Sequence, residues 1–154
     1  MKVRELMTAD PVTLRPTDRI VDAEEQMGLR GFRHVPVVDD ARRLVGMLSQ
    51  VDVIRASLAD GSDRIAVLRN KAAIKVEDVM STRLDTVGPD ADLADVAREL
   101  RRKHRACLPV VDGDLLLGVV TEADFVRIAA LALAPDAPWS GDLERAWHEG
   151  QATG

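Results

Sequence analysis

The chain contains the same sequence pattern twice, and this internal repeat restricts the folds open to it more than any other feature. The hexapeptide VRELMT at residues 3–8 returns as VEDVMS at residues 76–81. The tetrapeptide PVVD occurs at residues 36–39 and again at 109–112, and Thr-x-x-Pro occurs between these segments in both copies. Because order and spacing are kept while most other residues differ, the two copies predict two units of one structure.

A second shared segment combines a helix start with polar side chains. GMLSQVD at residues 46–52 returns as GVVTEAD at residues 118–124, so both copies keep a glycine, a hydroxyl and an aspartate. A hydroxyl followed three residues later by an acid is typical of a capping box, which stabilises a helix by about 1 kcal/mol. A hydroxyl and a carboxylate directed to one point can also hold a polar ligand. The pattern therefore indicates a cap, a ligand site, or both.

Each copy predicts the element order β-α-β-β-α. A β-branched strand is followed by a tight polar turn and a returning strand, and Asp-Gly in the second copy is a strong hairpin signal. The expected extended pieces are 11–14 and 84–87, the first helices 17–30 and 90–103, and the strands 35–38, 44–48, 108–111 and 115–120; the second helices begin at Ser49 and Thr121.

A unit of this size cannot bury a sufficient core alone. We therefore expect an α+β fold in which two repeats, related by pseudo-two-fold symmetry, pack sheet against sheet with the helices outside. The expected divisions are a first repeat at 1–58, a linker at 59–75, a second repeat at 76–134 and a C-terminal tail at 135–154. The tail contains Trp139 and Trp147, which either pack back on the module or contact a partner.

Composition limits the function classes. The net charge of -5 argues against a general nucleic-acid binder, and the single cysteine, Cys107, excludes an internal disulfide framework and fits a reducing compartment. The N-terminus does not resemble a signal peptide, and the longest apolar run, 128–134, is too short to span a bilayer. We expect a soluble cytoplasmic protein. Phosphate-loop, Gly-x-Ser-x-Gly and His-Glu-x-x-His motifs are absent, so we expect no enzyme.

Together these doubled motifs resemble a tandem pair of CBS domains, also called a Bateman module, over residues 3–131. The resemblance is to stand-alone CBS-pair proteins. It implies a regulatory module that binds an adenosine-containing ligand in a cleft between the repeats, with AMP, ADP or ATP as the expected ligand and no required cofactor. S-adenosylmethionine and NAD-type ligands also occur in this family. The resemblance further implies a homodimer shaped as a flat disc and a regulated protein partner.

The resemblance also implies ligand-binding positions. The aspartate of the doubled helix-start motif accepts hydrogen bonds from the ribose, and the hydroxyl residue lies beside the sugar and phosphate. The backbone of the lead-in, the extended segment that opens each copy ahead of its first helix, meets the adenine edge. The two residues just before the strand that begins hydrophobe-Pro-Val touch phosphate. In this chain the candidates are Asp52 with Ser49, Asp124 with Thr121, Pro11, Val12, Leu84, Asp85, Arg33 and His34. In the second copy, Ala106 and Cys107 replace Arg33 and His34.

The chemistry of these residue types fits such a ligand. An ionised aspartate accepts from both hydroxyls of a ribose diol, and a helix N-terminus favours a phosphate. Two other hypotheses stay open: a ligand-free structural or interaction module, and a nucleic-acid accessory protein acting through the basic run 101–105. His104 and Cys107 provide two metal-ligand types, which is too few for a zinc site, so we expect no metal.

Overall fold

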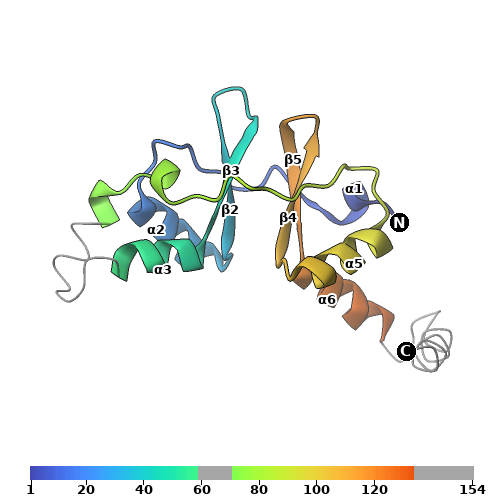
Figure 1. The fold of residues 1–154 in the computed structure, drawn as a ribbon. Helices are drawn as coiled ribbons and strands as arrows, with labels where there is room; N and C mark the ends of the chain where they lie inside the picture. Colours follow the sequence, from blue (N-terminus) through green and yellow to red (C-terminus); the bar gives the residue numbers. More distant parts are fainter. Residues whose placement is uncertain (59–70, 134–154) are drawn as a thin grey trace.

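The computed structural model describes residues 1–58 and 71–133. Each repeat contains one antiparallel hairpin. Strand β2 (His34–Val38) pairs with β3 (Leu44–Ser49), and β4 (Cys107–Asp112) pairs with β5 (Leu115–Thr121). The hairpins stand side by side in the middle of the molecule, with the helices outside them (Figure 1). The predicted α+β fold with two repeats is thus confirmed.

The hairpins also contact each other near their turns. Leu44 N donates to Asp114 O at 2.9 Å, and Leu116 N donates to Arg42 O at 3.1 Å. At the predicted Asp-Gly turn, Gly113 has a φ of 58°, a left-handed conformation that glycine adopts without steric cost. These backbone bonds join the two sheets into one structure.

In the part of the chain that the structure describes, two helices in each repeat cover the outer face of its hairpin. They are α2 (Ile20–Arg30) and α3 (Gln50–Leu58) in the first repeat, and α5 (Leu93–Lys103) and α6 (Glu122–Ala132) in the second. Each repeat has an aliphatic core between its helices and its hairpin, as expected from a chain with 3% aromatic residues. Within the described residues, no helix is long and apolar enough to cross a membrane.

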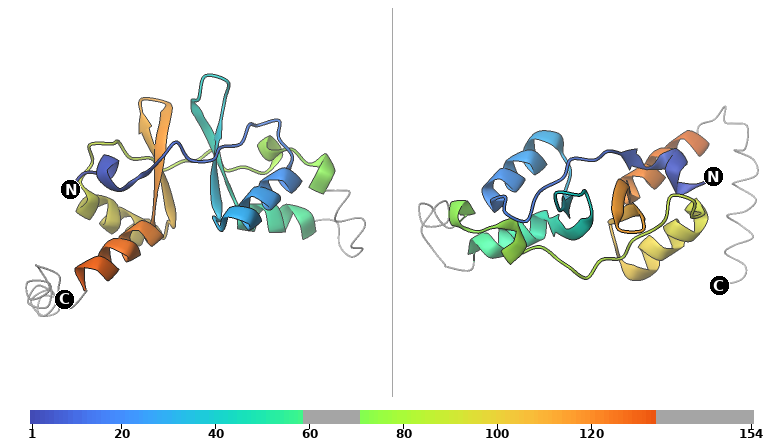
Figure 2. Two further views of the ribbon diagram at one scale, coloured as in Figure 1. Left: turned by 180° about the vertical axis from the view of Figure 1, so that it is seen from behind. Right: turned by 90° about the horizontal axis from the view of Figure 1, so that it is seen from above.

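The lead-in segments are exchanged between the repeats. Helix α1 (Val3–Leu6) and strand β1 (Thr8–Ala9) begin the first copy but pack on the second: Val3 is fully buried in its core, and β1 pairs with β5. The 3-10 helix η1 (Val76–Asp78) packs in the same way on the first repeat, where Val76 is fully buried. Seen from above, the segments 1–19 and 71–92 cross between the repeats on opposite sides (Figure 2).

This exchange corrects the predicted starts of the first helices. They begin at Ile20 and Leu93, three residues after the expected 17 and 90. Arg19 is held in extended backbone by a bridge to Lys75, and Ile20 N donates to Ile74 O at 3.1 Å. Asp92 has an equivalent bridge to Lys2. A residue paired as a strand cannot take helical backbone angles, so each helix begins just after its bridge.

The predicted extended pieces are present as short contacts with the hairpins. Leu14 forms a parallel bridge with Val37, and Val87 forms one with Val110. Most of the predicted linker, and the tail with Trp139 and Trp147, lie outside the described residues.

Candidate functional site

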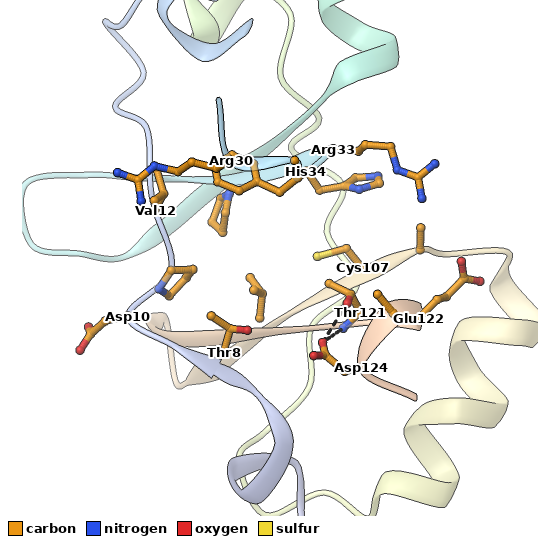
Figure 3. A pocket seen from close by; sticks show the side chains of 17 residues that line it. Thr8, Asp10, Val12, Arg30, Arg33, His34, Cys107, Thr121, Glu122 and Asp124 are labelled. Carbon is orange, nitrogen blue, oxygen red and sulfur yellow. Dashed lines mark hydrogen bonds between the residues drawn. The ribbon is translucent and has the colours of Figure 1, made fainter. Parts of the chain in front are cut away.

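Two clefts open between the repeats, and each takes residues from both. Cleft A has a volume of about 710 Å³. Its lining includes the predicted ligand residues Pro11, Val12, Arg33, His34, Thr121 and Asp124. Figure 3 shows Thr121 and Asp124 on the opposite side of this opening from Arg33 and His34. The exchange of the lead-ins therefore brings candidate residues of the first copy to the helix start of the second.

Cleft B has a volume of about 320 Å³. It combines the helix start of the first repeat with the lead-in of the second, the opposite of cleft A. Its lining includes Ser49 and Asp52 from the first repeat with Leu84 and Asp85 from the second. Each of the ten predicted ligand residues thus lines at least one of the two clefts. Each cleft combines the residues before the first helix of one copy with the helix start of the other copy. His34 lines both clefts, as do Ala106 and Cys107.

The helix starts have the capping geometry that their sequence predicts. Ser49 donates to Asp52 Oδ2 through its backbone N at 2.9 Å and its Oγ at 2.5 Å, and Asp52 N donates to Ser49 Oγ at 3.2 Å. Thr121 donates in the same way to Asp124 Oδ2, through N at 2.9 Å and Oγ1 at 2.8 Å. The caps occupy one carboxylate oxygen in each case. A cap and a ligand contact are compatible because the second oxygen is separate from these bonds.

The Asp124 carboxylate in cleft A is sheltered from solvent. Asp124 is 8% exposed, and its Oδ1 accepts one long bond of 3.3 Å from Arg127. A carboxylate buried this far with a weakly occupied oxygen gains from a further hydrogen-bond donor. Cleft A therefore presents an acceptor suited to a hydroxylated ligand.

Two cations of the first repeat line the same cleft. Arg30 and Arg33 line cleft A, and neither has a carboxylate within 4.0 Å among the residues that the structure describes. Burial lowers the pKa of His34, and the Arg33 guanidinium lowers it further. At neutral pH the positive charge on this side of cleft A consequently comes from the arginines.

Asp85 in cleft B is held by two cations, whereas Arg83, which also lines this cleft, has no carboxylate within 4.0 Å among the described residues. Asp85 accepts a 2.6 Å bond from Lys103 Nζ and a 3.0 Å bond from Arg105 Nε. The hydrogen bond from Lys103 lowers the pKa of Asp85 most, and the bond from Arg105 lowers it further. Asp85 occupies the position that Val12 has in the first copy. The two clefts consequently differ in size and in the charge at a repeated position.

Cys107 lies beside His34 between the two clefts (Figure 3). Burial raises the pKa of its thiol to about 12, with a smaller contribution from Asp124. Within residues 1–58 and 71–133, no group of three or more His, Cys, Asp and Glu side chains is placed to hold a metal ion.

Sequence reasoning missed several residues that line the clefts. Arg30 in cleft A and Arg105 in cleft B lie where α2 and α5 end, next to the left-handed residues Gly31 (φ 72°) and His104 (φ 52°). A left-handed residue reverses the chain, which returns the end of the helix to the start of the next strand. The available signal was a basic residue next to a helix-ending position, although the two arginines are not counterparts, since Arg30 aligns with Lys103 and Arg105 with Phe32.

Comparison with known proteins identifies the family of this two-cleft arrangement. The family model for the CBS domain matches twice, at residues 3–59 and 76–131. The chain belongs to the CBS domain family. CBS domain-containing protein YhcV of Bacillus subtilis is 30% identical over 122 residues, covering 79% of this chain and 81% of that protein.

Other curated CBS relatives are longer. Uncharacterized protein MJ1225 of Methanocaldococcus jannaschii is 31% identical over 126 residues, which are 82% of this chain. The chain spans 42% of that protein's length, and 32% and 24% of two further relatives.

Solved CBS-pair structures share the fold. A putative acetoin utilization protein (AcuB) from Vibrio cholerae has a TM-score of 0.73 and 36% identity, covering 84% of this chain and 90% of that chain. CBSX2, whose structure is a complex with AMP, has a TM-score of 0.72 and 28% identity, covering 84% of this chain and 96% of that chain.

Proposed function

We propose that this CBS pair is a regulatory module that binds an adenine nucleotide of the AMP, ADP or ATP class, with cleft A as its principal site. The observation that carries this proposal is the meeting, in one cleft, of a buried helix-start carboxylate and two arginines without carboxylate partners among the described residues. A CBS relative at 28% identity, CBSX2, has been solved with AMP. The volume of about 710 Å³ lies within the usual range of small-molecule sites.

Each part of the nucleotide has a complementary group in cleft A. Asp124 accepts from the ribose hydroxyls through Oδ1, while Oδ2 stays in the cap with Thr121. The phosphate lies toward Arg33 and the N-terminus of α6, whose positive dipole end favours an anion. The base lies along Pro11 and Val12, where apolar surface and backbone groups meet its edge. In cleft B the corresponding residues are Asp52, Ser49, Leu84 and Asp85.

Regulation follows from the position of the ligand between the repeats. A nucleotide that contacts both repeats favours the arrangement in which both sets of contacts are made, and so shifts the population of the module toward it. A regulated protein partner then responds because it binds one arrangement of the module better than the other. The single thiol fits the cytoplasm, where we place this function.

Thermal unfolding with AMP, ADP, ATP, S-adenosylmethionine and NADH tests the nucleotide class, because a ligand of the folded state raises Tm. We expect a rise with adenine nucleotides and a smaller one with 2′-deoxy-AMP and 3′-deoxy-AMP, which each lack one ribose hydroxyl. If S-adenosylmethionine or NADH raised Tm more than AMP, ADP and ATP do, the ligand class would be that compound's and not an adenine nucleotide of the AMP, ADP or ATP class. If none of these compounds shifts Tm at millimolar concentration, a ligand-free interaction module is the better account.

Two matched variants identify the cleft. Asp124→Asn keeps an oxygen for the cap but removes the charge in cleft A, and Asp52→Asn makes the same change in cleft B. We expect the first to weaken AMP binding by roughly 10- to 100-fold, the usual effect of losing hydrogen bonds to a charged group, and the second to leave it nearly unchanged. Equal losses in both variants would contradict the assignment to cleft A.

We also propose a homodimer with α3 in its interface. Val51, Ile54 and Leu58 lie on one side of that helix and are 52%, 47% and 66% exposed. Their equivalent region on α6 carries Val126, which is 67% exposed. Light scattering coupled to size exclusion should give twice the chain mass for the wild type and for Ile54→Leu, and a monomer for Ile54→Asp. A monomeric wild type would exclude the dimer.

A further inference from the structure

One repeated position differs in chemistry between the clefts. Val12 lines cleft A, and its counterpart Asp85 lines cleft B. The Asp85 carboxylate is held by Lys103 and Arg105, so it ties the second lead-in to the end of α5. An uncharged Val12 cannot make such a tie in the first copy. Figure 3 shows Val12 beside Arg30, the counterpart of Lys103.

This difference changes what each cleft offers to an anion. In cleft A, Arg30 and Arg33 have no carboxylate within 4.0 Å among the described residues, so their charge is available to a phosphate. In cleft B, Asp85 pairs with Arg105 and the neighbouring Lys103, which leaves Arg83 as the lining arginine without a carboxylate within 4.0 Å among the described residues. A phosphate entering cleft B would have to break these ion pairs or lie near an ionised carboxylate. Both cost free energy.

The ligand base faces the same obstacle. Asp85 is at the lead-in position where the base lies in our proposal for cleft A, and its side chain is partly buried at 26% exposure. Covering an ionised carboxylate with an uncharged base removes several water molecules, and the 6-amino group of adenine replaces only part of that hydration, which is unfavourable. Protonation does not relieve this, because the hydrogen bond from Lys103 lowers the pKa of Asp85. The smaller volume of cleft B, about 320 Å³ against 710 Å³, agrees with the tie across it.

We infer that Asp85 is the specificity-determining residue that excludes the nucleotide from cleft B and makes the chain a one-site binder. The inference rests on the proposed adenine-nucleotide function. It assigns the exclusion to one carboxylate that differs between the two copies, in addition to the replacement of Arg33 and His34 by Ala106 and Cys107. Replacing it by the residue of the other copy, Asp85→Val, removes the charge and frees Lys103 and Arg105 for a phosphate.

Calorimetric titration with AMP tests the inference through stoichiometry. The wild type should bind one AMP per chain, and both Asp85→Val and Asp85→Asn should bind two. Adding Asp52→Asn to Asp85→Val should return the value to one by disabling cleft B, and adding Asp124→Asn should leave one site, now in cleft B. The reciprocal variant Val12→Asp should bind none. Circular dichroism confirms that each variant is folded, and Asp85→Asn provides a nearly isosteric second case.

A double variant separates the carboxylate from the ion pairs it makes. Lys103→Ala with Arg105→Ala breaks the tie but keeps Asp85, so the inference expects one AMP per chain. Two sites in this variant would overturn it, as would two sites in the wild type or one site in folded Asp85→Val and Asp85→Asn. If the wild type binds no AMP, the proposed function of cleft A fails separately. The double variant Asp85→Val with Asp124→Asn then decides. One bound AMP per chain would support the exclusion by Asp85, and no bound AMP would overturn it.

Discussion

The side chain of Met80 occupies the space that a Cβ atom at Gly46 would require. Met80 belongs to the second lead-in and Gly46 to the first hairpin, so the contact crosses the repeats. The same relationship occurs on the other side, where a Cβ at Gly118 would lie 2.8 Å from Met7 Sδ and 2.7 Å from Thr8 O. The glycine of one repeated motif and the methionine of the other are therefore partners. Glycine is required there because the exchanged lead-in lies directly on the strand.

Alanine at these glycines should destabilise the protein unequally. Gly118→Ala meets a backbone oxygen that β1 holds in place, so we expect a loss of about 1–3 kcal/mol. Gly46→Ala meets a flexible methionine side chain and should cost less, and Met80→Ala in the same chain should relieve part of that cost. Urea denaturation measures each change.

Gly28→Ala is the matched control. This glycine lies within α2, and a Cβ atom at this position would meet nothing within 4 Å, so alanine should stabilise by about 0.5–1 kcal/mol. Equal losses at all three glycines would show that the contacts with the lead-ins are not the cause.

His34 should make the protein less stable in weak acid. Its folded pKa lies below the ordinary value of 6.5 because of burial and then Arg33. As pH falls through 6.5, the unfolded chain binds the proton first, so the free energy of unfolding decreases; above 6.5 the histidine stays neutral in both states and this effect is absent. Between about pH 7.5 and about pH 5, Tm should fall further in the wild type than in His34→Gln. Parallel curves would contradict this.

Cys107 should resist thiol reagents until the protein unfolds. It is the only cysteine of the chain, is 9% exposed, and has a pKa raised to about 12 by burial and then Asp124. Since the thiolate is the reactive form and an unfolded cysteine titrates near 8.5, reaction with Ellman's reagent at about pH 8 should be on the order of a thousandfold slower in the native protein than in urea. Comparable rates would show that the thiol is accessible and ionised.

The parts of this structure that the sequence predicts are those encoded locally and written twice. The hairpins follow from β-branched runs around a turn, and the caps at Ser49 and Thr121 follow from a hydroxyl and an acid three residues apart. Each signal involves neighbouring residues, so its outcome does not depend on the rest of the chain. Each signal also occurs in the second copy, which gives independent support for the same local structure.

The parts that could not be predicted depend on contacts between distant segments. Nothing near residues 17–19 shows that Lys75 pairs with Arg19 and delays α2. The grouping of Arg33 with Asp124 across the repeats likewise results from the exchanged lead-ins. The tie between Asp85 and Lys103 joins side chains that are 18 positions apart, and aspartate and lysine separately resemble ordinary solvated charges. Such features are properties of packing.

The exchanged lead-ins predict that the repeats unfold together. Val76 is fully buried in the core of the first repeat although it begins the second copy, so Val76→Ala should cost about 1–3 kcal/mol through two lost methyl groups and a cavity. Val3→Ala should act equally on the second repeat. Leu29→Ala, at a side chain that is 75% exposed, should stay within about 0.5 kcal/mol.

Hydrogen exchange shows where each loss is felt. In Val76→Ala, amide protons of β2 and β3 should exchange faster than in the wild type, although these strands precede the substitution by many residues in the chain. Because each core contains a segment from the other copy, urea should unfold both repeats in one transition, with the amides of both hairpins losing protection together. Two separate transitions, or faster exchange confined to residues 71–133, would show that the exchanged segments do not couple the repeats.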